Sequence, residues 1–109
     1  MKVAIACDRD VVSDHFGRCE KYVIFETHEG KLKNTYDLEN PGHQPGFLPK
    51  FLKDKGVEVL ITGGIGPRAL KIFDLCGIKV VASVSGRVQD IIDKFCKGEL
   101  KGEPKPCRH

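Results

Sequence analysis

The sequence predicts a mixed α/β fold with three helices in a single domain. Short, almost continuous apolar runs have the pattern of strands that are covered on both faces. Between them lie segments whose apolar residues recur at helical spacing, and in the second half of the chain the two kinds of segment alternate. Such alternation implies parallel strands joined by right-handed crossovers. The predicted order is therefore β-β-β-α-β-α-β-α, and we expect the domain to span residues 1–98 of the 109.

The strands are predicted from their apolar runs. Residues 3–7 form an uninterrupted run, and residues 57–61 and 78–82 each contain a single charge. Residues 22–25 and 31–37 are predicted to pair as a hairpin, because the segment between them is short enough to close one. The second strand of this hairpin carries lysines, which is typical of an exposed edge.

The helices are predicted from residues that begin or end them. The first covers residues 49–56 and ends at a glycine. The second covers residues 67–76, with proline in its first turn and glycine just beyond its end. The third covers residues 87–97 and is followed by glycine. Residues 99–109 contain two prolines and almost no apolar residue, so we expect a flexible tail.

Composition excludes several classes of protein. The net charge is +3, from 18 Lys and Arg against 15 Asp and Glu, without the basic clustering of a nucleic-acid interface. No apolar run approaches the roughly 20 residues of a membrane span. Five cysteines are an odd number and cannot form a closed disulfide framework, which favours a reduced, cytoplasmic protein. Nothing suggests an obligate dimer, so we expect a monomer.

A ligand site is expected beyond the carboxyl ends of the parallel strands, as in other open α/β sheets. Three loops qualify, at residues 8–19, 62–67 and 83–86, and two of them are glycine-rich and lead into helices. Exposed N–H groups at a helix start favour an anion. Residues 64–69 match the letters of a dinucleotide fingerprint, but no acidic residue follows at the end of the next strand. The alternative is that these glycines only turn the chain tightly.

The first of these loops carries the densest polar cluster. His15 and Cys19 offer imidazole and thiolate, the natural ligands of iron, copper and molybdenum–sulfur species, and Arg18 adds positive charge. Cys7 ends the first strand close to this loop. His43 lies in a turn-rich loop that leaves the same end of the sheet if the third strand is parallel to the first. On the residues alone, a solvated, hydrogen-bonding role for the loop histidine is an open alternative.

The remaining chemistry-bearing residues point away from catalysis. Cys76 and Cys96 lie on helix faces and are interpreted as core residues. Cys107 and His109 lie in the tail and make a poor metal site by themselves. There is no Cys-x-x-Cys pair for structural zinc, and neither a nucleophile–base pair nor a recurring carboxylate pair is present. The sequence therefore predicts a protein that is not an enzyme.

Five segments together resemble the dinitrogenase iron–molybdenum cofactor-binding family over residues 1 to about 100. They are residues 1–6, 13–19 (SDHFGRC), 22–25, 62–69 (TGGIGPRA) and 95–100. The resemblance implies a ribonuclease-H-like, three-layer fold with a five-stranded sheet in the order 3-2-1-4-5 and strand 2 antiparallel. It places loops 8–18 and 62–67 beside one crevice. It also implies that His15, in the His-Phe-Gly motif, is the ligand of a metal cluster.

The first functional hypothesis is a carrier of an anionic iron–sulfur or molybdenum–iron–sulfur cluster, exchanged with donor and acceptor proteins. His15 would ligate the cluster with Cys7 or Cys19, and His43 can share the site. The remaining predicted groups would neutralise the charge of the cluster: the N–H groups of Gly63, Gly64 and Gly66, with Arg18 and Arg68. The alternatives are a binding protein or sensor for a phosphorylated small ligand, which uses the glycine turns without metal, and an adaptor that works through its surface.

Overall fold

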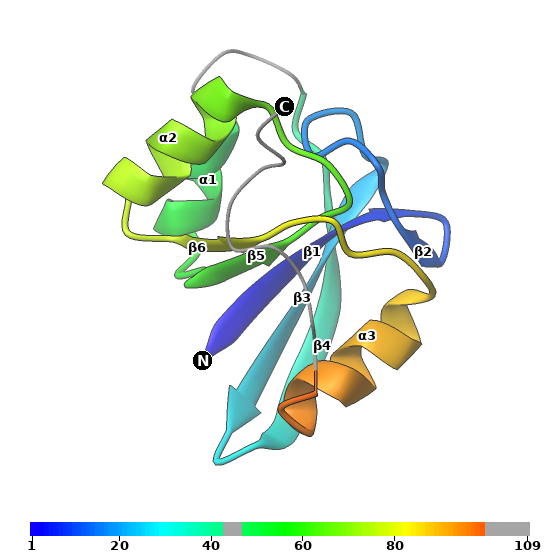
Figure 1. The fold of residues 1–109 in the computed structure, drawn as a ribbon. Coiled ribbons are helices and arrows are strands. Elements are labelled where there is room, and N and C mark those ends of the chain that lie inside the picture. Colours follow the sequence, from blue (N-terminus) through cyan, green and yellow to red (C-terminus); the bar gives the residue numbers. More distant parts are fainter. Residues whose placement is uncertain (43–46, 100–109) are drawn as a thin grey trace.

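The computed structural model describes residues 1–42 and 47–99 and confirms the mixed α/β class (Figure 1). Three helices and six strands occur in these ranges. The predictions for His43, Cys107 and His109, and for all of the tail except Glu99, lie outside the described residues. The elements are, in chain order, β1 (Lys2–Asp8), β2 (Val11–Val12), β3 (Lys21–His28), β4 (Lys31–Glu39), α1 (Phe47–Asp54), β5 (Val59–Ile61), α2 (Pro67–Leu75), β6 (Lys79–Val81) and α3 (Val88–Cys96).

The sheet is mixed, and its five longer strands lie in the order β4-β3-β1-β5-β6. β3 is antiparallel to both β1 and β4, whereas β1, β5 and β6 are parallel. The expectation of five strands is corrected by β2, in which Val12 pairs with Cys7 at the end of β1. Two residues are too few to show an apolar pattern, so sequence reasoning had no signal for this strand.

Glycine ends each helix in the same way, which also corrects two predicted boundaries. The N–H groups of Gly56 and Val57 donate to the carbonyls of Lys53 and Leu52, so both close α1. Gly77 and Ile78 close α2 through the equivalent bonds, and Gly98 and Glu99 close α3. Because Val57 and Ile78 belong to these helix ends, β5 and β6 begin later than predicted. α1 also begins two residues earlier than predicted, at Phe47.

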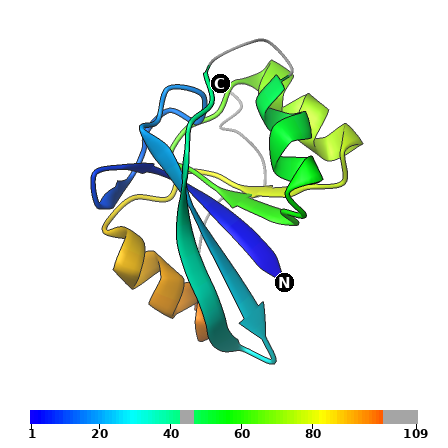
Figure 2. The same cartoon turned by 180° about the vertical axis from the view of Figure 1, so that it is seen from behind.

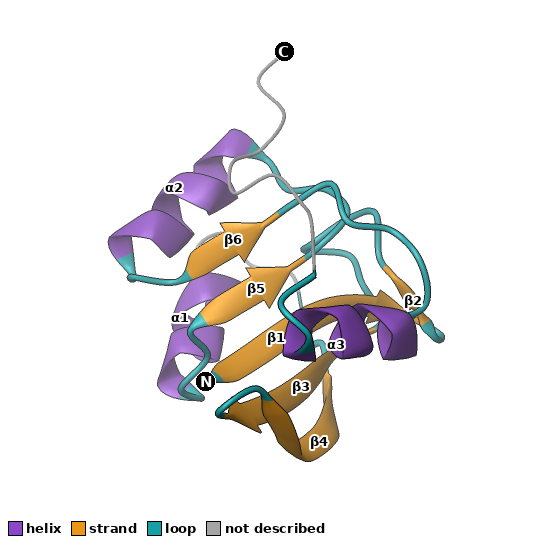
Figure 3. Cartoon of the chain, turned by 60° about the horizontal axis from the view of Figure 1, so that its bottom comes forward, coloured by secondary structure: helices purple, strands orange, loops and turns teal. Residues whose placement is uncertain are grey.

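The helices cover the two faces of the sheet, so the molecule has three layers (Figures 2 and 3). Neighbouring residues of β1 face opposite cores: Ala4 and Ala6 face α1 and α2, whereas Val3 and Ile5 face α3. All four side chains are fully buried, as the uninterrupted apolar run predicts. The carboxyl ends of β1, β5 and β6 meet at one end of this sandwich, where the predicted ligand loops lie.

Candidate functional site

The loops that follow β1 and β5 are joined through their backbones. The Gly63 N–H donates to the Ser13 carbonyl at 2.8 Å, and the Phe16 N–H donates to the Gly64 carbonyl at 3.0 Å. We call residues 13–18 and 62–68 the joined loops. Residues 13–18 follow β2, which pairs with the end of β1, and residues 62–68 follow β5, the parallel neighbour of β1. Both loops therefore lie at the end of the sheet where ligands bind in open α/β folds.

Two glycines are required for this contact. A Cβ atom on Gly63 would lie 2.8 Å from the Ser13 carbonyl oxygen, and one on Gly64 would lie 2.4 Å from the Asp14 carbonyl oxygen. Both distances are below what real Cβ atoms tolerate, and neither glycine has a left-handed φ angle. The glycines therefore serve close backbone approach rather than an unusual turn. Since the Gly63 N–H already donates to Ser13, it is not free for an anion.

The side chain of His15 is exposed, and a buried serine, Ser13, fixes its backbone. The Ser13 Oγ accepts the His15 N–H and donates to the His15 carbonyl, both at 3.1 Å. Ser13 itself is only 2% exposed. The imidazole consequently extends into solvent from a fixed position. Sequence reasoning did not single out Ser13 as an anchor.

The carbonyl of Phe16 is a second anchor of this loop. It accepts hydrogen bonds from the Tyr22 hydroxyl at 2.9 Å and from the Cys19 thiol at 3.3 Å. The side-chain amide of Asn40 donates to the carbonyls of Cys19 and Gly17, at 2.8 and 3.2 Å. Tyr22 on β3 and Asn40 just after β4 therefore fix the part of the loop between His15 and Arg18. Tyr22 was predicted only as a strand residue, and no sequence signal identified Asn40.

The two predicted thiol ligands lie on opposite faces of the sheet. Cys19 belongs to the core under α1 and α2, and Cys7 belongs to the core under α3. Burial raises the pKa of both thiols, and each donates a hydrogen bond to a carbonyl, of Phe16 and Arg9 respectively. At neutral pH they are therefore protonated donors rather than thiolates. Across residues 1–42 and 47–99, no three His, Cys, Asp or Glu side chains gather as a metal site.

The start of α2 provides the other polar groups of the joined loops. Gly66 is the residue before the helix and leaves its first turn without a side-chain cap. Arg68 in that first turn is exposed, as is Arg18 on the other loop. The joined loops thus present one imidazole, two guanidinium groups, the Asp14 carboxylate and the positive end of a helix on an open surface.

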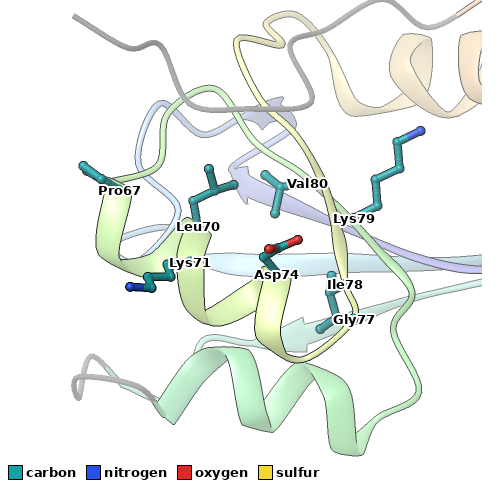
Figure 4. A pocket seen from close by; sticks show the side chains of 8 residues that line it. All are labelled: Pro67, Leu70, Lys71, Asp74, Gly77, Ile78, Lys79 and Val80. Atoms are coloured by element: carbon teal, nitrogen blue, oxygen red, sulfur yellow. The ribbon is translucent and has the colours of Figure 1, made fainter.

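Two hollows of the molecule are lined mainly by residues outside the joined loops. A groove of about 530 Å³ runs between α2 and β6, with Leu70 and Ile78 on its walls (Figure 4). A second hollow, of about 490 Å³, lies beside the start of α3 and contains Cys7 together with Lys21 and Arg87. Among the described residues that were predicted for the site, Cys7 alone lines one of them. The candidate site is therefore a surface rather than one of these pockets.

No helix within residues 1–42 and 47–99 is both long and apolar enough to cross a membrane.

Comparison with known proteins identifies relatives along almost the entire chain. The family model of the dinitrogenase iron-molybdenum cofactor matches residues 1–98. An uncharacterised protein of Methanocaldococcus jannaschii, MJ0580, is 34% identical over 106 residues, which cover 93% of this chain and 90% of the relative.

Solved structures show the same similarity. The crystal structure of PH0822 has a TM-score of 0.88 and 40% identity, covering 94% of this chain and 95% of that chain. The structure of TM1290 from Thermotoga, provisionally assigned as a NifB protein of the DUF35 family, has a TM-score of 0.77 and 32% identity. It covers 99% of this chain and 97% of that chain.

Proposed function

The chain belongs to the dinitrogenase iron-molybdenum cofactor family, and we propose that it is a non-catalytic carrier of an anionic iron–sulfur or molybdenum–iron–sulfur cluster. The cluster binds at the joined loops, and His15 is its protein ligand. One observation carries this proposal. The His15 imidazole is exposed on a loop that backbone hydrogen bonds join to Gly63 and Gly64, in the loop before α2.

The groups around His15 suit an anionic cluster. An imidazole nitrogen is a good ligand for iron, and a guanidinium group donates several hydrogen bonds to the sulfides of a cluster. Arg18 and Arg68 supply two such groups, from the two loops that the backbone contact joins. The N–H groups of Gly64 and Gly66 and the positive end of α2 add to this field. Against these two arginines the joined loops carry one carboxylate, that of Asp14, so the balance of charge favours an anion over a bare cation.

The burial of the Cys7 and Cys19 thiols limits which side chains can ligate the cluster. Cys7 and Cys19 are protonated and point into different cores, so the proposal assigns ligation to His15 without them. A cluster that is held by one imidazole and by charge exchanges more readily than one with three or four thiolates. Ready exchange suits a carrier that receives its cargo from one protein and delivers it to another. The four cysteines described are all unpaired, which supports a reducing, cytoplasmic setting.

Anaerobic reconstitution tests the proposal. Protein made without oxygen is incubated with iron, sulfide and molybdate, and the colour and metal content that remain after gel filtration are measured. We expect wild type to retain a coloured cluster and His15→Ala to lose most of it. His28→Ala is the matched control, because His28 is also an exposed histidine but lies at the end of β3, next to the β3–β4 turn. Equal retention by His15→Ala and wild type, or colourless wild type, contradicts the proposal.

Thermal denaturation of the same variants, with and without phosphate compounds, distinguishes the phosphorylated-ligand alternative. Phosphate esters and nucleotides would use the arginines and the N–H groups of the joined loops but not the imidazole as a metal ligand. That alternative expects thermal stabilisation by such compounds in wild type and His15→Ala alike, with no metal retained by either.

A further inference from the structure

The outer edge of β4 is open among the described residues. β4 is the last strand of the sheet and pairs only with β3. Eight of its nine residues are exposed, including Tyr36 at 39%. Figures 1 and 3 show β4 at the margin of the sheet. An open strand of this length is a template for another strand.

The charges of β4 are arranged in a self-complementary order. Its first half carries Lys31 and Lys33, and its second half carries Asp37 and Glu39. A parallel, in-register pair of these strands would place lysine opposite lysine and carboxylate opposite carboxylate, which is destabilising. An antiparallel pair instead places the lysines of each strand opposite the carboxylates of the other. The edge therefore fits a second copy of itself in one direction only.

We propose that two copies of this protein associate through β4, antiparallel and centred on Tyr36, into one continuous sheet. In this register Lys33 of one copy lies opposite Glu39 of the second, and the symmetry forms this pair twice. Thr35 lies opposite Asp37 of the second copy, where its hydroxyl can donate to the carboxylate. The two exposed Tyr36 rings meet at the symmetry axis and remove apolar surface from water.

The regular part of β4 sets this register. The pairing with β3 is continuous from Asn34 to Glu39 and shifts next to Lys33, at a bulge opposite Glu26 and Thr27. Lys33 is the extra residue of this bulge. A two-fold axis at Tyr36 therefore pairs the regular residues 34–38 with one another and brings Lys33, at the bulge, opposite Glu39. Lys31 lies beyond the bulge and has no opposite residue in the second strand. The intramolecular ion pair of Lys21 and Asp37, at 2.9 Å, is retained in each copy.

Such a dimer leaves the candidate site open. His15 lies at the end of the sheet where β1 finishes, and the antiparallel arrangement puts the two copies of this end at opposite extremes of the joined sheet. One seven-residue strand pair is small beside standard protein interfaces. The association is accordingly weak and depends on protein concentration, which differs from the monomer expected from the sequence.

Charge reversal tests the pairing. Sedimentation velocity is measured from micromolar to millimolar protein for wild type, Lys33→Glu, Glu39→Lys and the double variant. Each single variant is expected to raise the dimer dissociation constant roughly tenfold, because the symmetry repeats every changed pair. The double variant exchanges the two charges and is expected to restore wild-type association. Lys31→Glu is the matched control and should associate like wild type, and circular dichroism should show that every variant is folded.

Cysteine crosslinking tests the register. Tyr36→Cys is expected to form a disulfide dimer on mild oxidation, since residues opposite each other across strands lie within disulfide range. Thr35→Cys should crosslink far less, because its counterpart is a diagonal neighbour at roughly 7–8 Å. Wild type oxidised in parallel accounts for its own thiols. A monomer up to millimolar concentration, or a dimer that the single charge reversals leave unchanged, overturns the proposal.

Discussion

His15 and His28 are both exposed histidines near the end of a strand, but their surroundings differ. His28 ends β3, and the chain turns back through Glu29 and Gly30, whose φ angles are 53° and 78°. Positive φ at both central residues is the geometry of the tight hairpin turn between neighbouring antiparallel strands. The interaction described for the His28 imidazole is a distant one, 3.9 Å from the Glu29 carboxylate.

His15 instead lies where two loops meet. Its loop is joined to residues 63–64 by backbone hydrogen bonds, and further hydrogen bonds from the side chains of Ser13, Tyr22 and Asn40 anchor it. The two loops follow β1 and β5, which are adjacent in the sheet but separated by about half of the chain. The comparison teaches that residue type and exposure do not make the candidate site. What distinguishes His15 is the convergence of two loops, because hydrogen bonds fix its backbone beside residues 63–64.

The largest expected difference between the two regions concerns their glycines. Gly64→Ala is expected to lower the free energy of unfolding by about 3 kcal/mol, because its Cβ atom would meet the Asp14 carbonyl oxygen at 2.4 Å and force two backbones apart. Gly30→Ala meets only the Cys96 carbonyl, at an ordinary 3.6 Å. Its cost is the left-handed φ angle, about 1 kcal/mol. Urea denaturation of both variants measures the difference, and equal losses would show that the joined loops are no tighter than the hairpin turn.

Much of this fold follows from local sequence patterns. The apolar run of β1, the prolines and the glycines at helix ends predict the α/β class because each acts through its own few residues. β2 was not predictable, since Val12 is held by Cys7 on β1 and by the distant Gly86 carbonyl, to which its N–H donates at 2.9 Å. Such a strand exists only because tertiary contacts supply its partners.

The candidate site likewise combines features that local sequence predicts with features that depend on tertiary contacts. The glycines and His15 were identified from the sequence, but the partners of Gly63 and Gly64 were not, because a close backbone approach leaves no signal in either loop alone. The face of the sheet on which Cys7 lies could have been predicted, since strand alternation puts it on the side of Val3 and Ile5, away from Ala4 and Ala6. The position of Cys19 could not be predicted, because its burial depends on the path of an irregular loop.

Alkaline pH should destabilise the folded protein through its buried thiols. Burial raises the pKa of the Cys7 and Cys19 thiols and of the Tyr22 hydroxyl, so these groups stay protonated in the folded protein. In the unfolded chain the thiols ionise near their usual pKa of 9.0. Their contribution to stability is therefore complete below this pH and is lost as the pH rises above it, toward the raised pKa of the folded state.

Urea denaturation over a series of pH values checks this. The free energy of unfolding of wild type should fall above the usual thiol pKa, and Cys19→Ala should show a shallower fall because one of the contributing groups is removed. A free energy that stays flat through this range would mean that the thiols titrate alike in the folded and unfolded states.

The smallest expected effect isolates the anchor of the Phe16 carbonyl. Tyr22→Phe removes the hydroxyl that donates to it at 2.9 Å, while the Cys19 thiol still donates at 3.3 Å. We therefore expect a loss of only about 1 kcal/mol in the free energy of unfolding. Tyr36→Phe is the matched control, since Tyr36 is exposed on β4, and it should change stability by less than about 0.5 kcal/mol.

Hydrogen exchange tests the same anchor locally. Tyr22→Phe should speed exchange of the Phe16 N–H, which donates to Gly64, whereas the N–H groups of the β3–β4 hairpin should keep their wild-type rates. Unchanged exchange at Phe16 would mean that the contact between the two loops holds His15 in place without support from β3.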